Sequence, residues 1–286
     1  MLRAAETRLR PDARTRSAAR ARAARAVALS SPPALGSARD FSVLTGLADP
    51  PAFARATTTL RFAGASVLLY LDERAAGAYE AAEIDALGRQ FDEVLYPIDR
   101  RAFGTESDTD GNGRVIVVLT PAVNALVRAD ECASFGYVTG YFFGLDLVSS
   151  APESNRGEVF YAMTPDPEGR FSCAHSSAEV ARALPPTFVH ELQHMISYGR
   201  RVLVEQGEPE VPWLNEGLSH LAEELGARYY EAKYPAPAAR TDPGQLFPDS
   251  ASPMITGDLR NSYRFLSEPR QHSIATCAPA TYCTTA

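Results

Sequence analysis

The stretch that constrains this chain most is residues 187–196, TFVHELQHMI. Its apolar residues recur at helical spacing, which predicts a helix with one side packed against the rest of the protein. His190 and His194 are four residues apart, so both imidazoles lie on one helix face and can reach one metal ion. Glu191 would then lie beside the ion and could move a proton. A surface helix with two solvated histidines fits the same residues.

A second motif follows in residues 213–223, WLNEGLSHLAE, and places Glu216 on another predicted helix. Catalytic zinc takes three protein ligands and leaves one position for water, so this carboxylate would complete a set with His190 and His194. The two motifs in this order resemble the gluzincin metallopeptidases, the group of thermolysin and aminopeptidase N. Together with residues 108–113, DTDGNG, the first motif most resembles the hyicolysin-type neutral metallopeptidases.

The resemblance implies a thermolysin-like α+β fold and a zinc-dependent peptidase, an endopeptidase acting on proteins or peptides. It makes His190, His194 and Glu216 the ligands of one zinc ion. Glu191 becomes the general base that takes a proton from water and later returns it to the leaving amine. Glu223 lies on the same helix face as Glu216 and is expected to accept a hydrogen bond from a zinc-bound histidine. A solvated acid is the alternative for Glu223.

Two positions leave the family pattern incomplete. The thermolysin pattern has an aspartate four residues after the glutamate ligand, where this chain has His220. This histidine is either part of the site wall or a surface residue. Gluzincins also use a tyrosine or histidine to stabilise the oxyanion. Tyr263 is our candidate for that donor, with core packing as its alternative; the other candidates are Tyr229, Tyr230 and His272.

Asp108, Asp110 and Asn112 match the first half of a calcium-binding loop, with Gly113 directly after them. The twelfth position of an EF-hand would fall on Leu119, which cannot bind a cation, so an EF-hand is excluded. A short calcium-binding turn of another kind is one interpretation. A turn capped by the Asp and Asn side chains is the other.

The order of the predicted elements favours an α+β protein in which strands come first and helices second. Strands are expected within residues 57–71, 114–120, 136–145 and 158–163. Helices are expected at residues 79–95, 176–184, 188–204, 214–230 and 258–266, with a break at Pro185 and Pro186 because proline interrupts a helix interior.

Four segments are expected along the chain. Residues 1–39 form a basic, disordered tail or pro-segment with nine arginines against Glu6 and Asp12. Residues 40–175 form a β-rich subdomain, and residues 176–270 form a helical subdomain that carries the zinc site. Residues 271–286 form an irregular tail that reads as truncated beside the gluzincin pattern. That tail motivates an alternative function, a catalytically inactive zinc-binding or scaffold module of the same fold.

Composition narrows the remaining function classes. The 286 residues carry a net charge of −7 and are 45% hydrophobic, which excludes a wholly disordered protein and argues against nucleic acid as a partner. No apolar run is long enough for a membrane span. The four cysteines form no C-x-x-C pair and are either unpaired thiols or one or two disulfides of an exported protein. Export is expected, although residues 26–29 are too short for the apolar core of a signal peptide.

Overall fold

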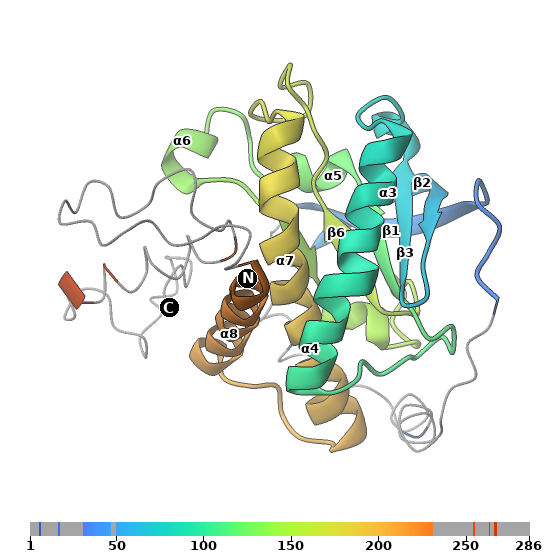
Figure 1. Cartoon of the computed structure of the whole chain (residues 1–286), viewed down its shortest axis with the longest axis vertical. Helices are drawn as coiled ribbons and strands as arrows, with labels where there is room; N and C mark the ends of the chain where they lie inside the picture. Colours follow the sequence, from blue (N-terminus) through green and yellow to red (C-terminus); the bar gives the residue numbers. More distant parts are fainter. Residues whose placement is uncertain are drawn as a thin grey trace.

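The computed structural model describes residues 31–46 and 50–230 and six isolated positions, Glu6, Ser17, Met254, Tyr263, Leu266 and Ser267. These residues form a mixed α+β protein, as the sequence predicts. A curled sheet lies on one side of the molecule and the long helices lie against it (Figure 1). Most of the predicted helix at residues 258–266, most of the predicted tail at residues 1–39 and all of the tail at residues 271–286 lie outside the described residues.

The sheet has six strands in the described part of the chain, in the spatial order β1-β2-β3-β4-β6-β5. Strands β1, β2 and β3 pair antiparallel, β3, β4 and β6 pair parallel, and the edge strand β5 runs antiparallel to β6. Their bounds are β1 (Ala38–Gly46), β2 (Ala52–Ala63), β3 (Val67–Asp72), β4 (Val115–Leu119), β5 (Gly140–Phe142) and β6 (Val159–Ala162).

The central strands are apolar along their whole length because both faces of the sheet are covered. Every residue of β3, β4 and β6 is buried. Along β6, Phe160 faces the helices and packs edge-on against Phe188, with ring centroids 5.9 Å apart. The next residue, Tyr161, points to the opposite face, where it stacks on Tyr141 of β5 at 4.6 Å. Strand alternation therefore supplies apolar side chains to two layers.

The sheet curls so that its first strand, β1, approaches its last strand, β5, on the face opposite the helices. Although β1 and β5 are at opposite ends of the strand order, the Leu44 amide donates a hydrogen bond to the Tyr141 hydroxyl over 3.0 Å. Asn155 joins the same region, because its side chain accepts from the Ser42 amide at 2.8 Å and donates to the Ser42 carbonyl at 2.8 Å. The sheet is thus curled enough to bring its two edges together.

Two long helical segments lie against the other face of the sheet, and a third packs on these two (Figure 1). The first is a continuous rod made of α3 (Ala81–Arg89), the π-helical turn η2 (Gln90–Leu95) and α4 (Tyr96–Phe103). The second is α7 (Ser177–Tyr198), continued by the π-helical turn η4 (Gly199–Val204), and the third is α8 (Pro212–Tyr230). Phe91 of the rod stacks on Phe188 of α7 with centroids 4.3 Å apart. That contact ties the rod to α7 through the core.

The expected break at Pro185 and Pro186 is wrong, because α7 continues through both prolines. Each proline lacks the amide that would bond the carbonyl four residues earlier, which destabilises the helix. Its apolar face nevertheless runs on without interruption, since Val180, Leu184 and Phe188 are all buried. A capping box between Ser176 and Glu179 also fixes the first turn. Burial and capping together offset the missing hydrogen bonds.

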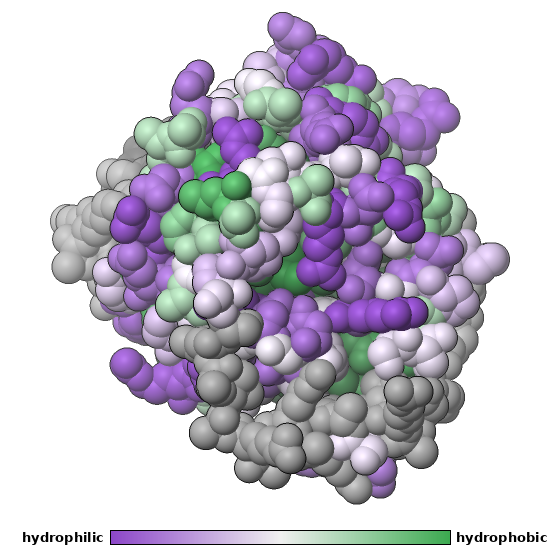
Figure 2. Space-filling view, turned by 90° about the vertical axis from the view of Figure 1, so that its right-hand side faces the viewer, coloured by the Kyte–Doolittle hydropathy of each residue, from purple (hydrophilic) through white to green (hydrophobic). Residues whose placement is uncertain are grey.

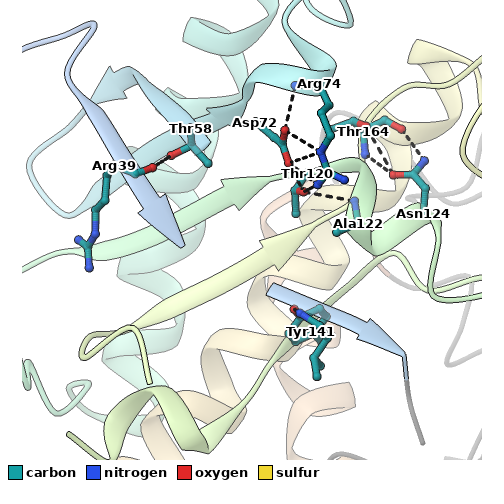
Figure 3. A network of polar contacts seen from close by, with 10 residues as sticks. Arg39, Thr58, Asp72, Arg74, Thr120, Ala122, Asn124, Tyr141 and Thr164 are labelled. Atoms are coloured by element: carbon teal, nitrogen blue, oxygen red, sulfur yellow. Dashed lines mark hydrogen bonds and ion pairs between the residues drawn. The ribbon is translucent and has the colours of Figure 1, made fainter. Parts of the chain in front are cut away.

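A polar network closes the carboxyl ends of the parallel strands (Figure 3). Asp72, the last residue of β3, accepts hydrogen bonds from the Thr120 hydroxyl at 2.6 Å and from Arg74 at 2.7 Å. Asn124 then binds Thr164 in both directions, donating to its carbonyl at 2.9 Å and accepting from its amide at 3.0 Å. These side chains satisfy one another's hydrogen-bonding groups and connect the carboxyl ends of the three strands.

The short helices are η1 (Glu73–Ala75), α5 (Pro121–Asn124), α6 (Cys132–Phe135) and η3 (Gly144–Leu147). A disulfide joins Cys132 of α6 to Cys173 ahead of α7, and Cys277 and Cys283 lie outside the described residues. In the view turned by 90°, the described surface is mostly hydrophilic, with apolar side chains in small separate areas (Figure 2). No helix among the described residues is long and apolar enough to cross a membrane.

Candidate metal centre

The two histidines of the first motif and the glutamate of the second meet where α7 and α8 pack together. His190 and His194 lie one turn apart on α7, and Glu216 lies in the second turn of α8. Oε2 of Glu216 is 3.2 Å from Nε2 of His190 and 3.5 Å from Nε2 of His194. Three donor atoms from two helices therefore converge on one point.

The spacing of these atoms fits a tetrahedral zinc ion. Bonds of about 2.0–2.2 Å in a tetrahedral site place neighbouring ligand atoms about 3.3–3.6 Å apart. The two nitrogen-to-oxygen distances to Glu216, 3.2 and 3.5 Å, agree with that separation. Two imidazoles and one carboxylate also form a donor set that zinc accepts in catalytic sites.

The Nδ1 atom of each imidazole, which faces away from Glu216, is hydrogen-bonded to a side-chain oxygen. Nδ1 of His190 lies 2.7 Å from Oε1 of Glu223, and Nδ1 of His194 lies 2.5 Å from the side-chain oxygen of Asn215. Both oxygens act as acceptors of an Nδ1 proton, so each ring in its neutral form directs the lone pair of Nε2 at Glu216. Two lone pairs facing a carboxylate are stabilised by a cation among them. The outer partners therefore set the tautomer that metal binding requires.

In the absence of a metal, the same contacts shift the pKa values of Glu216 and His190 strongly. Burial raises the pKa of Glu216, but hydrogen bonds from His190 and His194 lower it more, and the net pKa lies well below its usual range. Burial lowers the pKa of His190, whereas its bonds to Glu216 and Glu223 raise it, with a net value of about 10. The carboxylates at this centre are thus held ionised by imidazoles.

Glu191 lies between the histidines and the edge of the sheet. Its side chain is buried, and Oε2 accepts a hydrogen bond of 2.8 Å from the amide of Phe142, the last residue of β5. Its carboxylate lies within 4.8 Å of ring nitrogens of both His190 and His194. The backbone of the edge strand thus fixes a carboxylate beside the metal-binding group.

His220 belongs to the wall of this centre, which decides between its two interpretations. Its ring centroid lies 5.2 Å from that of His190. Its Nδ1 lies 3.1 Å from Oε1 of Glu223, the atom that also faces His190. Glu223 is therefore shared between two histidines, and the interpretation of this glutamate as a solvated acid is wrong.

Three residues at the centre were not singled out from the sequence. Asn215 belongs to the WLNEG string and could have been found there, whereas Ser219 and Asp99 stand in no motif. The Ser219 hydroxyl donates to the Glu216 carbonyl at 2.8 Å and lies 3.2 Å from Nε2 of His190. Asp99 of α4 is fully buried, and neither of its oxygens has a hydrogen-bond partner among the described residues. Burial raises its pKa well above the usual range, opposed by the charge of His190.

The structure does not bring the predicted oxyanion donors or calcium ligands to the group of His190, His194 and Glu216. Tyr263 is 49% exposed, and the structure describes no contact between it and the His190–Glu216 pair. Tyr229 is exposed as well, while His272 and the side chain of Tyr230 fall outside the description. Asp108 and its neighbours lie in a separate loop between α4 and β4.

Comparison with known proteins gives one informative match. No family model matches the chain. Over 140 residues it is 30% identical to the neutral metalloprotease ShpI of Staphylococcus hyicus. The match covers 49% of this chain but 30% of the length of that protein, so the chain spans less than a third of its relative. The chain is thus distantly similar to a metalloprotease, which agrees with a group of side chains, His190, Glu191 and His194, that could hold a metal ion.

Proposed function

We propose that the chain is a zinc-dependent endopeptidase of the gluzincin type, with a thermolysin-like catalytic domain and protein or peptide substrates. The observation that carries this proposal is the convergence of His190, His194 and Glu216, with Glu191 beside them. The similarity to a neutral metalloprotease supports metallopeptidase function in general.

His190, His194 and Glu216 are the residues that would hold zinc in this proposal. A zinc ion at that position would lower the pKa of a bound water to about 7 and polarise a substrate carbonyl. Glu223 and Asn215 hold the two imidazole rings in the correct tautomer through their Nδ1 atoms. Such outer partners typically contribute roughly 10–100-fold to metal affinity or activity.

Glu191 is the proposed proton carrier. Its carboxylate takes the proton of the attacking water and delivers it to the amine that leaves when the peptide bond breaks. The hydrogen bond from the Phe142 amide restricts the rotation of the carboxylate and keeps it beside the histidines. A positioned acid–base group contributes roughly 10²–10⁴-fold to the rate. Tyr263 stays a prediction for the oxyanion donor.

Export from the cell is the proposed location. The disulfide between Cys132 and Cys173 supports it, because such bonds persist mainly in oxidising compartments. A thiol titration of the purified chain under denaturing conditions, with and without reductant, checks that the bond forms.

The function is tested by measuring zinc content and casein hydrolysis for the wild type and for Glu191→Gln. The matched control is Glu205→Gln, an exposed glutamate paired with Arg200 on η4. The expected result is about one zinc per chain in all three proteins. Hydrolysis should be sensitive to 1,10-phenanthroline and should fall roughly 10²–10⁴-fold in Glu191→Gln only.

Two outcomes would contradict the proposal. Zinc bound by the wild type without any hydrolysis would favour the inactive scaffold module, and no zinc at all would exclude both functions. Internal cleavage is separated from end trimming by the products. An endopeptidase releases large casein fragments early, whereas an aminopeptidase releases free amino acids.

A further inference from the structure

A second group of carboxylates lies away from the histidines, between the loop after α4 and the start of β6. Asp108 and Asp110 belong to that loop, and Glu158 directly precedes β6. One oxygen from each of the three lies within 4.8 Å of the others. Residues so distant in sequence meet because β4 and β6 are parallel neighbours, with the Ile116 amide donating to the Glu158 carbonyl at 2.7 Å.

The surroundings of Glu158 are the evidence that this group binds a ligand. Its side chain is 0% exposed. Oε1 accepts hydrogen bonds from the Ser107 hydroxyl at 2.7 Å and from the amide and hydroxyl of Thr109 at 2.8 and 3.1 Å, which direct the carboxyl group at the loop. Oε2 is buried and has no hydrogen-bond partner among the residues that the structure describes. A buried acceptor left without a donor is costly, so this carboxyl group needs either a proton of its own or a cation beside it.

The electrostatics of the group agree with this requirement. Burial and then the negative charge of Asp110 raise the pKa of Glu158 to about 8. Negative charges from Asp110 and Glu106 thus act on a carboxyl group that water does not reach. A divalent cation would neutralise these charges and leave all the carboxylates ionised.

The surrounding backbone lets the carboxylates come together. Gly157 leaves room for Asp110, since a Cβ at that position would be 3.0 Å from Oδ2 of the aspartate. The Gly113 amide donates to Asp108 Oδ1 at 2.8 Å, and the Asn112 amide donates to Asp110 Oδ1 at 3.1 Å. The loop thereby fixes one oxygen of Asp108 and both oxygens of Asp110, since the Asn112 side chain also donates to Asp110 Oδ2.

We propose that Asp108, Asp110 and Glu158 bind a calcium ion at a site separate from the candidate metal centre. The donors are all carboxylate oxygens, which select hard cations such as calcium over zinc. Calcium also tolerates the irregular geometry of a loop, whereas magnesium demands a nearly ideal octahedron. Asn112, expected from the sequence to be a ligand, instead accepts from the Arg114 amide and donates to Asp110 at 2.6 Å. Glu158 takes its place.

Calcium at this site would stabilise the region that carries the histidines. Ser107, beside Asp108, packs against Gly199 at the end of α7, where an added Cβ would lie 3.0 Å from the Ser107 Cβ. The loop that holds the cation is thus also a support for the end of the metal-binding helix. Removal of calcium is expected to lower the unfolding temperature without removing zinc.

The test is calcium titration of the full chain, stripped of calcium and reloaded with zinc, by calorimetry and by thermal unfolding in up to about 10 mM calcium. Wild type should bind one calcium ion and unfold at a higher temperature. Glu158→Gln and Asp110→Asn should each bind calcium at least about tenfold more weakly. Asp130→Asn, an exposed aspartate paired with Arg128, is the control and should behave as wild type.

Several results would contradict the proposed calcium site. Wild type that binds no calcium in this range excludes it, as does unchanged affinity in both Glu158→Gln and Asp110→Asn. Equal affinity for magnesium would overturn the assignment to calcium. Asp110→Asn changes an exposed side chain and keeps the inference testable if Glu158→Gln does not fold. Zinc content, measured in every sample, separates this result from the fate of the peptidase proposal.

Discussion

Two groups of buried acids in this molecule are handled in opposite ways. At the candidate metal centre, Glu216 and Glu223 lie against imidazole nitrogens, and their pKa values are lowered. In the loop group, Glu158 faces other carboxylates, and its pKa is raised to about 8. A histidine can supply positive charge from within the protein, whereas a cluster of oxygens cannot. The protein itself therefore compensates the charge of the first group, whereas the second group would need a cation from solution to do so.

The largest expected effect comes from removing the carboxylate on which the histidines converge. Glu216→Ala deletes the oxygen that lies 3.2 and 3.5 Å from the two Nε2 atoms. Only two protein ligands would remain, so zinc content and casein hydrolysis should both fall below detection. Zinc analysis after dialysis checks the first and a casein assay the second. Retention of full zinc and activity in Glu216→Ala would show that this oxygen is not a ligand.

A smaller effect is expected from Glu223, which acts through His190. Glu223→Gln weakens the acceptor for the Nδ1 proton and should lower zinc affinity or kcat roughly 10–100-fold. Its neighbour Glu224, which pairs with Arg228 at 2.6 Å, provides the matched control Glu224→Gln. Zinc affinity is measured by competition with a chelating dye. Equal losses in both variants would assign the effect to the stability of α8 and not to His190.

Asp146 offers an intermediate case, because it is fully buried and has hydrogen-bond donors but no imidazole. The Tyr161 hydroxyl donates to it at 2.7 Å, and Asn155 donates from its amide at 2.8 Å and its side chain at 2.9 Å. Burial still outweighs these bonds and raises the pKa from 3.8 to about 6. Neutral hydrogen-bond donors therefore compensate the burial of a carboxylate less than charged partners do.

The pH dependence of stability follows from that shift. A carboxyl group whose pKa is higher in the folded state favours folding below its unfolded pKa and loses that contribution as the pH rises through about 6. Asp146→Asn removes this dependence, so the variant should gain roughly 2 kcal/mol relative to wild type between pH 4 and pH 7. Urea unfolding at several pH values measures the difference, with Asp130→Asn as control. A difference that stays constant over this range would contradict the assignment.

How much the sequence could predict differs between the two groups for a physical reason. The histidines, Glu191, Glu216 and Glu223 lie on two helices, where a spacing of three or four residues determines the shared face. Glu158 is far from Asp108 in sequence, and only the pairing of β4 with β6 brings them together. Asp99 of α4 is likewise placed within electrostatic range of His190 by packing, which no local motif reports.

Helix α7 shows a different limit of prediction from the sequence. Local propensity predicts a break at Pro185 and Pro186, but the buried residues before and after them belong to one core. Tertiary packing can therefore override a strong local preference. The predicted strands at residues 114–120 and 158–163, by contrast, appear as β4 and β6 because continuous apolar runs suit strands that are covered on both faces.

The central claim is that two imidazoles and one carboxylate of this chain hold zinc. X-ray absorption at the zinc edge of the metal-loaded protein tests it most directly. The account predicts a first shell of nitrogen and oxygen at about 2.0–2.2 Å with imidazole scattering, unchanged in Glu191→Gln and lost in Glu216→Ala. Sulfur at about 2.3 Å, or the same spectrum in Glu216→Ala, would contradict it.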